Sequence, residues 1–174
     1  EILGPLEMHN SRYALDRFPE GNFARRYDRE GKELPFLFIN VLGSGGLYST
    51  PADMARLAGM LIGKGKIGSV RILSENSVAH MAQDQTLSSF NPVKSDTVSY
   101  GLGWDTVRQP GLGAVGVTAW QKGGAIPYTK SIFTVAPDEK LAVFVVGASG
   151  NFDSDDALAL AERVLLNALR EKGR

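Results

Sequence analysis

The pattern of apolar and polar residues predicts a helix that begins after Thr50. Thr50 is a good N-cap, and Pro51 stands at the first helical position, where its missing N–H costs no hydrogen bond. Apolar residues then recur at helical spacing and form one stripe for burial. These residues are Met54, Leu57, Ala58, Leu61 and Ile62. Gly63 and Gly65 predict the end of this helix.

Two further helices are predicted from caps and periodicity. Ser74 is expected to cap a helix that carries Val78, Met81 and Ala82. The last helix closes the chain, with Ser154 as its cap and two aspartates in its first turn, where negative charge suits the helix dipole. Its predicted apolar face consists of Leu158, Ala161, Leu165, Ala168 and Leu169.

The second half of the chain predicts strands. The candidates are residues 98–107, 114–120, 129–136 and 141–146, which are rich in β-branched, aromatic or apolar residues. Residues 137–140 read Pro-Asp-Glu-Lys, a strong turn signal, so the last two strands are expected to pair as a hairpin. A hairpin followed by an amphipathic helix predicts an α+β fold, with that helix packed on one face of an antiparallel sheet.

The first half has a different texture. Prolines and glycines punctuate residues 1–48, and the mixed-charge run 25–32 is expected to be a solvated loop or hairpin tip. The apolar run 35–39 is expected to be buried, and the polar run 88–97 to be a loop. This change of texture divides the chain into a loop-rich and helical part, 1–97, and a part with the sheet and last helix, 98–174.

Composition and charge narrow the function. The 174 residues are 43% hydrophobic, enough for one core, and 19 basic residues balance 19 acidic ones. A neutral chain has no broad electrostatic reason to bind nucleic acid, and no apolar run approaches the roughly 18 residues that span a bilayer. The absence of cysteine excludes thiolate catalysis, and with two histidines we expect no metal and no cofactor.

Six segments, taken in chain order, resemble motifs of one enzyme family. They are I-L-G-P-L-E-M at 2–8, G-G-L-Y-S-T-P-A-D-M-A-R at 45–56, R-I-L-S at 71–74, Y-G-L-G-W at 100–104, W-Q-K-G-G-A at 120–125 and V-A-P-D-E-K-L-A-V at 135–143. The set resembles the serine β-lactamase-like family, which includes class C β-lactamases, penicillin-binding proteins, D-amino-acid peptidases and related esterases. Glu7 stands where the family usually has glycine.

The resemblance implies acyl transfer, which needs a nucleophile, a base and donors for the developing oxyanion. The family takes its serine and lysine from S-x-x-K and a second proton-handling group from Y-x-N or S-x-N. The chain has no S-x-x-K, T-x-x-K or Y-x-N, and its S-x-N matches at 74, 89 and 149 all follow the P-L-x-M segment, whereas the family's element precedes it. We therefore predict no catalytic residue in this chain and expect the nucleophile upstream.

The resemblance implies that residues 122–128 form the third part of the family's active site, after the S-x-x-K and the Y-x-N or S-x-N elements. Lys122 falls at the lysine of K-T-G, where it would attract a substrate carboxylate; otherwise it is an ordinary strand lysine. Gly123 and Gly124 would let substrate backbone approach, or would mark a bulge or turn. Ala125 would present the oxyanion-hole N–H, or would be a plain core or edge alanine. Tyr128, where many relatives have glycine nearby, would narrow the rim, with Lys130 a weaker candidate there.

Two functions follow as hypotheses. In the first, the chain is the C-terminal portion of a serine hydrolase for amides, β-lactams or esters and is inactive alone. In the second, it is a non-catalytic binding or structural module with a β-lactamase-like fold. A small acyl substrate would reach the whole parent, and the missing N-terminal segment or a second copy would cover the exposed sheet. The resemblance suggests a periplasmic, secreted or lipid-anchored parent.

Overall fold

The computed structural model describes residues 1–13, 23–39, 41–86 and 99–173. Its helices are α1 (Pro51–Ile62), α2 (Glu75–Met81), α3 (Pro110–Gly113) and α4 (Ser154–Glu171). Its strands are β1 (Arg12–Tyr13), β2 (Arg26–Tyr27), β3 (Glu33–Leu34), β4 (Leu47–Tyr48), β5 (Lys66–Ile67), β6 (Val70–Arg71), β7 (Trp120–Ile126), β8 (Thr129–Ala136) and β9 (Leu141–Gly147).

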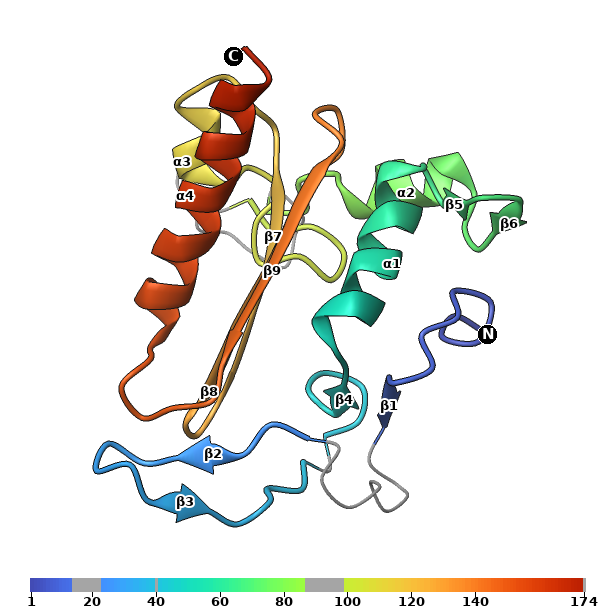
Figure 1. Ribbon diagram of the computed structural model, residues 1–174. Helices are drawn as coiled ribbons and strands as arrows, with labels where there is room; N and C mark the ends of the chain where they lie inside the picture. Colours follow the sequence, from blue (N-terminus) through green and yellow to red (C-terminus); the bar gives the residue numbers. More distant parts are fainter. Residues whose placement is uncertain (14–22, 40, 87–98, 174) are drawn as a thin grey trace.

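The centre of the molecule is the antiparallel sheet β7-β8-β9, which lies between α4 on one face and α1 on the other (Figure 1). Trp120 of β7 pairs with Val135 of β8, and Val135 pairs in turn with Ala142 of β9. The predicted α+β fold with a C-terminal helix on the sheet is confirmed.

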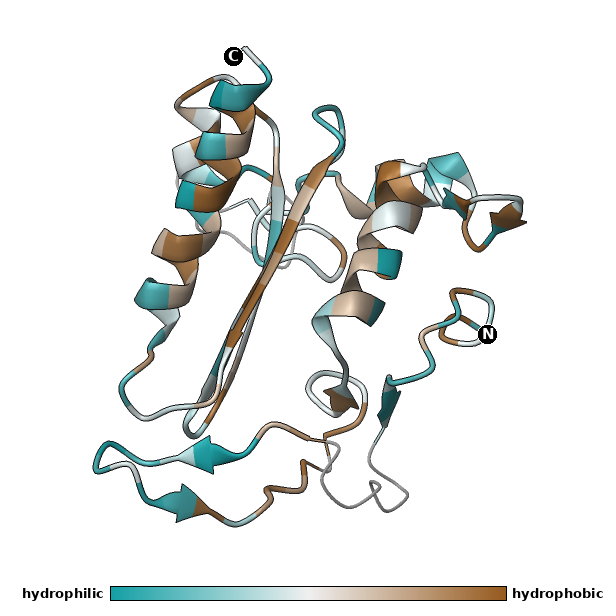
Figure 2. Ribbon diagram, viewed as in Figure 1, coloured by the Kyte–Doolittle hydropathy of each residue, from teal (hydrophilic) through white to brown (hydrophobic). Residues whose placement is uncertain are grey.

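Alternation along β8 divides the core between the two faces. Phe133 and Val135 belong to the cluster that also holds Trp104 and Trp120, on the side of α1. Ile132 and Ala136 point to the other side and pack in the clusters formed with α4. Figure 2 shows hydrophobic residues along much of β9, which helices cover from both sides. The two tryptophans are thus part of the core.

The predicted helix starts are confirmed for α1 and α2. The Thr50 side chain accepts a hydrogen bond from the Asp53 N–H at 3.2 Å, and the Ser74 side chain accepts one from the Ser77 N–H at 3.0 Å. Gly63 ends α1. Each cap therefore satisfies a backbone donor that the first helical turn leaves without an intrahelical partner.

The cap predicted for α4 was wrong by one residue. Asp153, not Ser154, is the N-cap, and its carboxylate accepts hydrogen bonds from the N–H groups of Asp155 and Asp156, each at 2.9 Å. Asp156 returns the bond by accepting from the Asp153 N–H at 3.0 Å. Both N–H groups donate to the same Oδ1, and its negative charge makes these hydrogen bonds stronger than hydrogen bonds to a neutral hydroxyl. The buried face of α4 consists of Ala157, Ala161, Leu165 and Leu169.

The prediction of a strand at 98–107 was wrong for the described residues 99–107. They contain turns and isolated bridges, such as Gly101 with Trp104. A Cβ on Gly101 would lie 2.5 Å from the Met81 carbonyl oxygen, so this segment packs against the end of α2 as only glycine allows. The segment thus forms a compact loop instead of a strand.

The prediction of a strand at 114–120 was also wrong. The short helix α3 precedes this segment, with Gln109 as its cap and Pro110 at its start, and a turn follows in which Gly116 has φ +77°. β7 begins only at Trp120. The apolar residues Val117 and Ala119 are buried against the side of α4, so the hydrophobic pattern reported burial correctly but not strand pairing.

The remaining strand predictions are confirmed. β8 and β9 form the expected hairpin, and the Lys140 N–H donates to the Pro137 carbonyl at 3.0 Å in the predicted turn. The mixed-charge run 25–32 lies in the hairpin formed by β2 and β3, which crosses one end of the sheet in Figure 1. The expected loop at 88–97 lies outside the described residues, and the division of the chain after residue 97 stays a prediction.

The expected burial of residues 35–39 was wrong. Phe36 is 42% exposed and Phe38 is 52% exposed. The segment continues from β3 along the end of the sheet, where Phe36 packs edge-on against Phe23 at 5.0 Å between ring centroids. The described elements cover this aromatic run only in part.

The N-terminal segment is fastened to α1 through a buried carboxylate. Asp53 is 4% exposed and accepts hydrogen bonds from the Asn10 N–H at 2.9 Å and the Ser11 hydroxyl at 2.7 Å. Glu7 has φ +53°, a conformation that favours glycine, and its carboxylate pairs with Arg56 of α1. The residue that departs from the resembled motif therefore stands where the backbone itself favours glycine.

Candidate functional site

The candidate site lies along the outer edge of β7, the edge that β8 does not cover. The Gln121 N–H donates to the Thr106 carbonyl at 2.8 Å, and the Asp105 N–H donates to the Gln121 carbonyl at 2.9 Å. The Gly123 N–H donates to the Asp105 carboxylate at 2.6 Å. In an antiparallel strand, alternate residues direct their backbone groups to the same side. Residues 121, 123 and 125 therefore present their backbone to this outer edge.

Ala125 is the point where this edge opens. The 105–106 segment covers the edge at Gln121 and reaches Gly123 through a side chain. Two residues further on, Ala125 is exposed, with its N–H and carbonyl directed to the same edge. The plain core reading of Ala125 is thereby excluded, and the edge position leaves a backbone donor facing outward.

Lys122 is held at the same edge by an ion pair. Its Nζ donates to both carboxylate oxygens of Asp105, at 3.0 and 3.2 Å, and to the Gly123 carbonyl at 2.6 Å. The Lys122 side chain is 46% exposed and that of Asp105 is 51% exposed. An exposed pair of this kind contributes only about 0.2–1 kcal/mol to stability, so its importance lies in where it places charge.

Asp105 was missed in the sequence. It directly follows the Y-G-L-G-W motif and lies 17 residues before Lys122, a separation that no helical or hairpin spacing connects. The sequence showed only that an acidic residue follows the Y-G-L-G-W motif, which belongs to the same resembled family as the K-G-G segment. It did not show that this carboxylate accepts a hydrogen bond from the Gly123 N–H.

The loop that carries Asp105 is anchored on both sides. Trp104 is buried and stacks on Phe133 at 5.9 Å between ring centroids. On the other side, the Leu102 N–H donates to the Met81 carbonyl at 3.0 Å, at the end of α2. The Tyr100 N–H donates to the Thr86 hydroxyl at 3.0 Å. These contacts fix the position of Asp105 beside β7.

Asp84 strengthens the same anchor. The Thr86 hydroxyl first, and then the Thr86 N–H, hydrogen-bond its carboxylate and hold the pKa of Asp84 below its usual value. The Thr86 N–H lies 2.9 Å from the carboxylate. Since Thr86 also binds the Tyr100 N–H, this short network connects the end of α2 to the Y-G-L-G-W loop.

Gly123 and Gly124 fit tightly into the sheet. Pairing between β7 and β8 runs without interruption from Trp120 to Ile126, so neither glycine marks a bulge. A Cβ on Gly124 would lie 2.5 Å from the Ser131 Oγ, and one on Gly123 would lie 3.2 Å from the Asp105 carboxylate. A side chain at Gly123 would press on the Asp105 carboxylate, and one at Gly124 would require the Ser131 hydroxyl to move.

Tyr128 lies in the turn at the far end of β7. The loop between β7 and β8 consists of Pro127 and Tyr128, and Tyr128 has φ +60°, as the second central residue of a type II turn requires. Arg26 donates to the Pro127 carbonyl at 3.1 Å, and Lys130 donates to the Ile126 carbonyl at 3.2 Å. The structure thus places Tyr128, which is 39% exposed, in the turn that follows the strand of Lys122 and Ala125.

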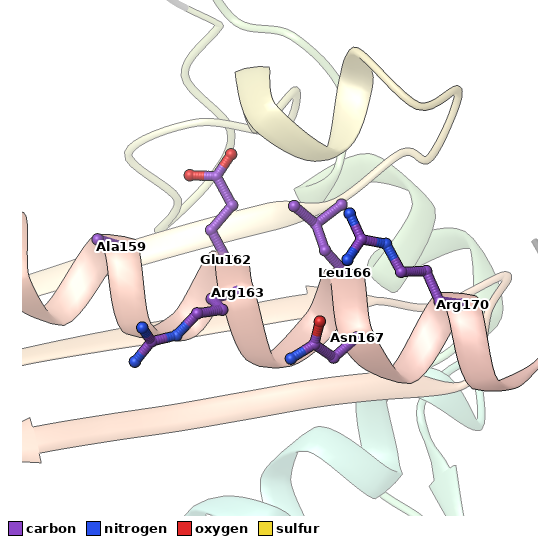
Figure 3. Close-up of a pocket in the computed structure, with 6 residues that line it drawn as sticks. All are labelled: Ala159, Glu162, Arg163, Leu166, Asn167 and Arg170. Carbon is purple, nitrogen blue, oxygen red and sulfur yellow. The ribbon is translucent and has the colours of Figure 1, made fainter.

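Other candidate chemistry lies elsewhere. His9 and His80 are both exposed, on a loop and on α2. Among the described residues, no three His, Asp or Glu side chains come together as metal ligands would. A shallow hollow of about 270 Å³ lies on the outer face of α4, lined by Ala159, Glu162, Arg163, Leu166, Asn167 and Arg170. Figure 3 shows these side chains projecting from α4, with Glu162 directed toward α3.

The comparison with protein families decides the assignment. The family model Beta-lactamase matches residues 1–168. The chain belongs to the Beta-lactamase family. A comparison with curated protein sequences finds no match. Within the described part of this Beta-lactamase family chain, no helix combines the length and the apolar character that crossing a bilayer requires.

Solved structures agree on the fold. A class C beta lactamase from Rhodobacter sphaeroides is 16% identical, with TM-score 0.70, and the match covers 97% of this chain and 52% of that one. A penicillin binding protein from Bacillus halodurans is 20% identical, with TM-score 0.67 and coverage of 94% and 47%. A D-stereospecific amidohydrolase from Streptomyces sp. is 22% identical, with TM-score 0.62 and coverage of 92% and 45%.

These matches establish the β-lactamase/transpeptidase fold for this Beta-lactamase family chain. At such identities they speak for the fold alone. The chain spans about half the length of the solved structures that it matches.

Proposed function

We propose that this Beta-lactamase family chain is the C-terminal portion of a serine hydrolase that forms an acyl-enzyme with an amide, β-lactam or ester. The observation that carries the proposal is the outer edge of β7, where the exposed Ala125 directs its N–H outward beside Lys122. A backbone donor aimed at an open edge is suited to an oxyanion, because charge develops there in acyl transfer.

The roles of the other residues follow from their places on this edge. Lys122 supplies positive charge at its closed end, and Gly123 and Gly124 keep the edge free of side chains. Tyr128 forms the rim at its other end. In this proposal these residues form one wall of a groove for a small acyl substrate, with Ala125 at its centre.

The nucleophile and base belong to a segment outside this chain. The 174 residues hold neither S-x-x-K nor Y-x-N, and the relatives of known structure are about twice as long. We propose that the chain alone is inactive. The preceding segment of the parent, or a second copy, would pair with β9, which is the last strand on its side of the described sheet.

Covalent labelling tests whether the nucleophile lies outside these 174 residues. The purified 174-residue chain should not be acylated by a fluorophosphonate or a fluorescent penicillin, whereas the whole parent should be labelled by at least one of them at one site. Mass spectrometry locates the labelled residue. Stoichiometric labelling of a serine within the 174 residues would contradict the proposal.

The Ala125 N–H is tested by removing it without removing the residue. Ala125→Pro in the whole parent deletes the donor, and proline is tolerated on an edge strand whose N–H points outward. Loss of one oxyanion donor costs roughly 10²–10³-fold in kcat. Ala125→Gly keeps the N–H and serves as the matched control, so equal kcat values for the two variants would exclude Ala125 from the oxyanion hole.

The second candidate function is a non-catalytic binding or structural module. The ion pair between Lys122 and Asp105 favours this alternative, because Asp105 already neutralises the lysine that would bind a charged substrate. A parent that lacks S-x-x-K and takes no label under the conditions above would establish this alternative.

A further inference from the structure

The edge of β7 already holds a carboxylate. The Asp105 carboxylate accepts hydrogen bonds from the Lys122 Nζ, at 3.0 and 3.2 Å, and from the Gly123 N–H at 2.6 Å. A cation and a backbone N–H directed at the same point are the donors that a substrate carboxylate would use. Asp105 therefore binds to Lys122 at the place where the sequence analysis expected a substrate carboxylate.

We infer that Asp105 determines the charge of the acyl groups that this groove accepts: it favours uncharged acyl groups and rejects those with a carboxylate near Lys122. The inference rests on the proposed function and deepens it by naming a substrate class. Asp105 acts as a specificity-determining residue, because an incoming carboxylate must either displace it from Lys122 or lie beside it as a like charge.

The backbone around Asp105 opposes displacement. The N–H groups of Asp105 and Thr106 both donate to the Gln121 carbonyl, at 2.9 and 3.2 Å, and the preceding Trp104 is buried in the core. The carboxylate can rotate about its side-chain bonds, but its Cα stays beside Gly123. Displacement would thus break three hydrogen bonds and leave the negative charge at the same end of the groove.

The neighbouring cations are engaged elsewhere. Arg26 donates to the carbonyl of Pro127, and Lys130 donates to the carbonyl of Ile126, so both hold the turn at the far end of β7. Either would have to leave this turn to balance a second carboxylate at Lys122. The charge at the closed end of the groove is therefore set by Lys122 and Asp105 together.

Strand geometry indicates which acyl groups would bring a carboxylate close to Asp105. Gly123 and Ala125 are two residues apart on β7, which is about 6.8 Å along an antiparallel strand. An acyl carbonyl bound at the Ala125 N–H thus has Asp105 within reach of the far end of a short acyl chain. A glutaryl group, with three methylene groups between its carbonyl and its carboxylate, places its charge in this region, and a valeryl group of the same length has a methyl group there.

The test compares two esters on the whole parent. The 4-nitrophenyl ester of valerate and the mono-4-nitrophenyl ester of glutarate differ only in the terminal group. We expect a higher kcat/KM for the valerate ester in the wild-type protein. Asp105→Asn keeps an acceptor for the Gly123 N–H and removes the charge, so it should raise the glutarate-to-valerate ratio of kcat/KM by roughly 10–100-fold, since like-charge contacts cost several kcal/mol.

Two variants serve as controls. Asp105→Glu retains the negative charge and should keep a low ratio. Asp138→Asn removes one negative charge from the exposed turn between β8 and β9 and should leave the ratio unchanged. Valerate hydrolysis with an unchanged ratio in Asp105→Asn would overturn the inference and leave the proposed function standing. No hydrolysis of either ester by the wild-type protein, with no labelling, would overturn both.

A second measurement needs no variant and so does not depend on the folding of one. Glutarate and the uncharged glutaramide are compared as competitive inhibitors of wild-type valerate hydrolysis. We expect glutarate to inhibit no better than glutaramide. Inhibition by glutarate that is ten times stronger would show an open anion site and would overturn the inference.

Discussion

The two faces of the β7-β8-β9 sheet are built from alternate residues of the same strands, yet they end differently. On the face of α4, one apolar cluster holds Leu165 and Leu169 and a second holds Ile132, and the partly buried Val143 packs against both. On the face of α1, the aromatic core ends at Trp120, and the next residues of β7 on that face are the exposed Lys122 and Gly124. Both helices contact β8 and β9, but α4, with 18 residues, is longer than α1, with 12.

This comparison indicates how the fold separates stability from function. A face covered along its length can only be filled, so its residues are selected for volume. On the other face, buried residues cover only the first part of the edge strand. The rest of that strand leaves backbone donors and a charged side chain exposed beside the rigid core. The rigid half then positions the open half, as a site built on regular elements requires.

The largest effect is expected on the closed face. Leu165→Ala removes a side chain that is 2% exposed between α4 and the sheet, and such truncations cost about 2–5 kcal/mol. The free energy of unfolding from urea titration of the whole parent measures the loss. Val164→Ala, at an exposed position of the same helix, is the control and should cost far less. Similar costs for both would contradict the closed core assigned to this face.

The next effect is expected where core and groove meet on the open face. Gly124→Ala places a Cβ 2.5 Å from the Ser131 Oγ, so this hydroxyl must rotate away, and the change should destabilise the protein by about 1 kcal/mol. Ser131→Ala removes the opposing hydroxyl, so the double variant should recover most of the loss. A double-mutant cycle from denaturant unfolding gives the coupling. Additive effects would show that Gly124 is not limited by Ser131.

A smaller effect of opposite sign is expected at the rim. Tyr128 has φ +60°, where glycine avoids the steric cost of a side chain, so Tyr128→Gly should stabilise the fold by about 0.5–1 kcal/mol. Tyr128→Phe keeps the side-chain volume and the φ angle and should change stability little. If the tyrosine narrows the rim, Tyr128→Gly should also lower KM for a bulky ester. A lower Tm for Tyr128→Gly in thermal unfolding would contradict the proposed backbone strain at Tyr128.

The smallest effect concerns the anchor of the Asp105 loop. The pKa of Asp84 is lowered in the folded protein, so its stabilising contribution is present above the unfolded pKa of about 3.9 and is lost as the pH falls through the lower folded pKa. Wild type and Asp84→Asn should therefore differ in Tm near neutral pH and converge in strong acid. In an NMR titration, Thr86→Val should move the Asp84 midpoint upward, and an unmoved midpoint would exclude the Thr86 hydroxyl as the cause.

Local signals in the sequence were sufficient for several elements. Thr50 with Pro51, and Ser74, placed the starts of α1 and α2, because a cap acts on backbone groups within a few residues of itself. The Pro-Asp-Glu-Lys turn fixed the β8–β9 hairpin for the same reason. The ordered motifs were sufficient for the family. The strand predictions for the described residues 99–107 and for 114–119 failed because the buried apolar residues there pack in loops against distant elements, and burial alone does not define strand pairing.

By itself, the sequence determined the caps of α1 and α2, the β8–β9 hairpin and the family. Tertiary structure alone decided that β7 has an open edge at Ala125 and that Asp105 meets Lys122 and Gly123 there. The physical reason is range. Caps and turns depend on neighbours in the chain, whereas the contact between Asp105 and Lys122 exists because the buried Trp104 and the end of α2 hold one loop against a strand 17 residues away.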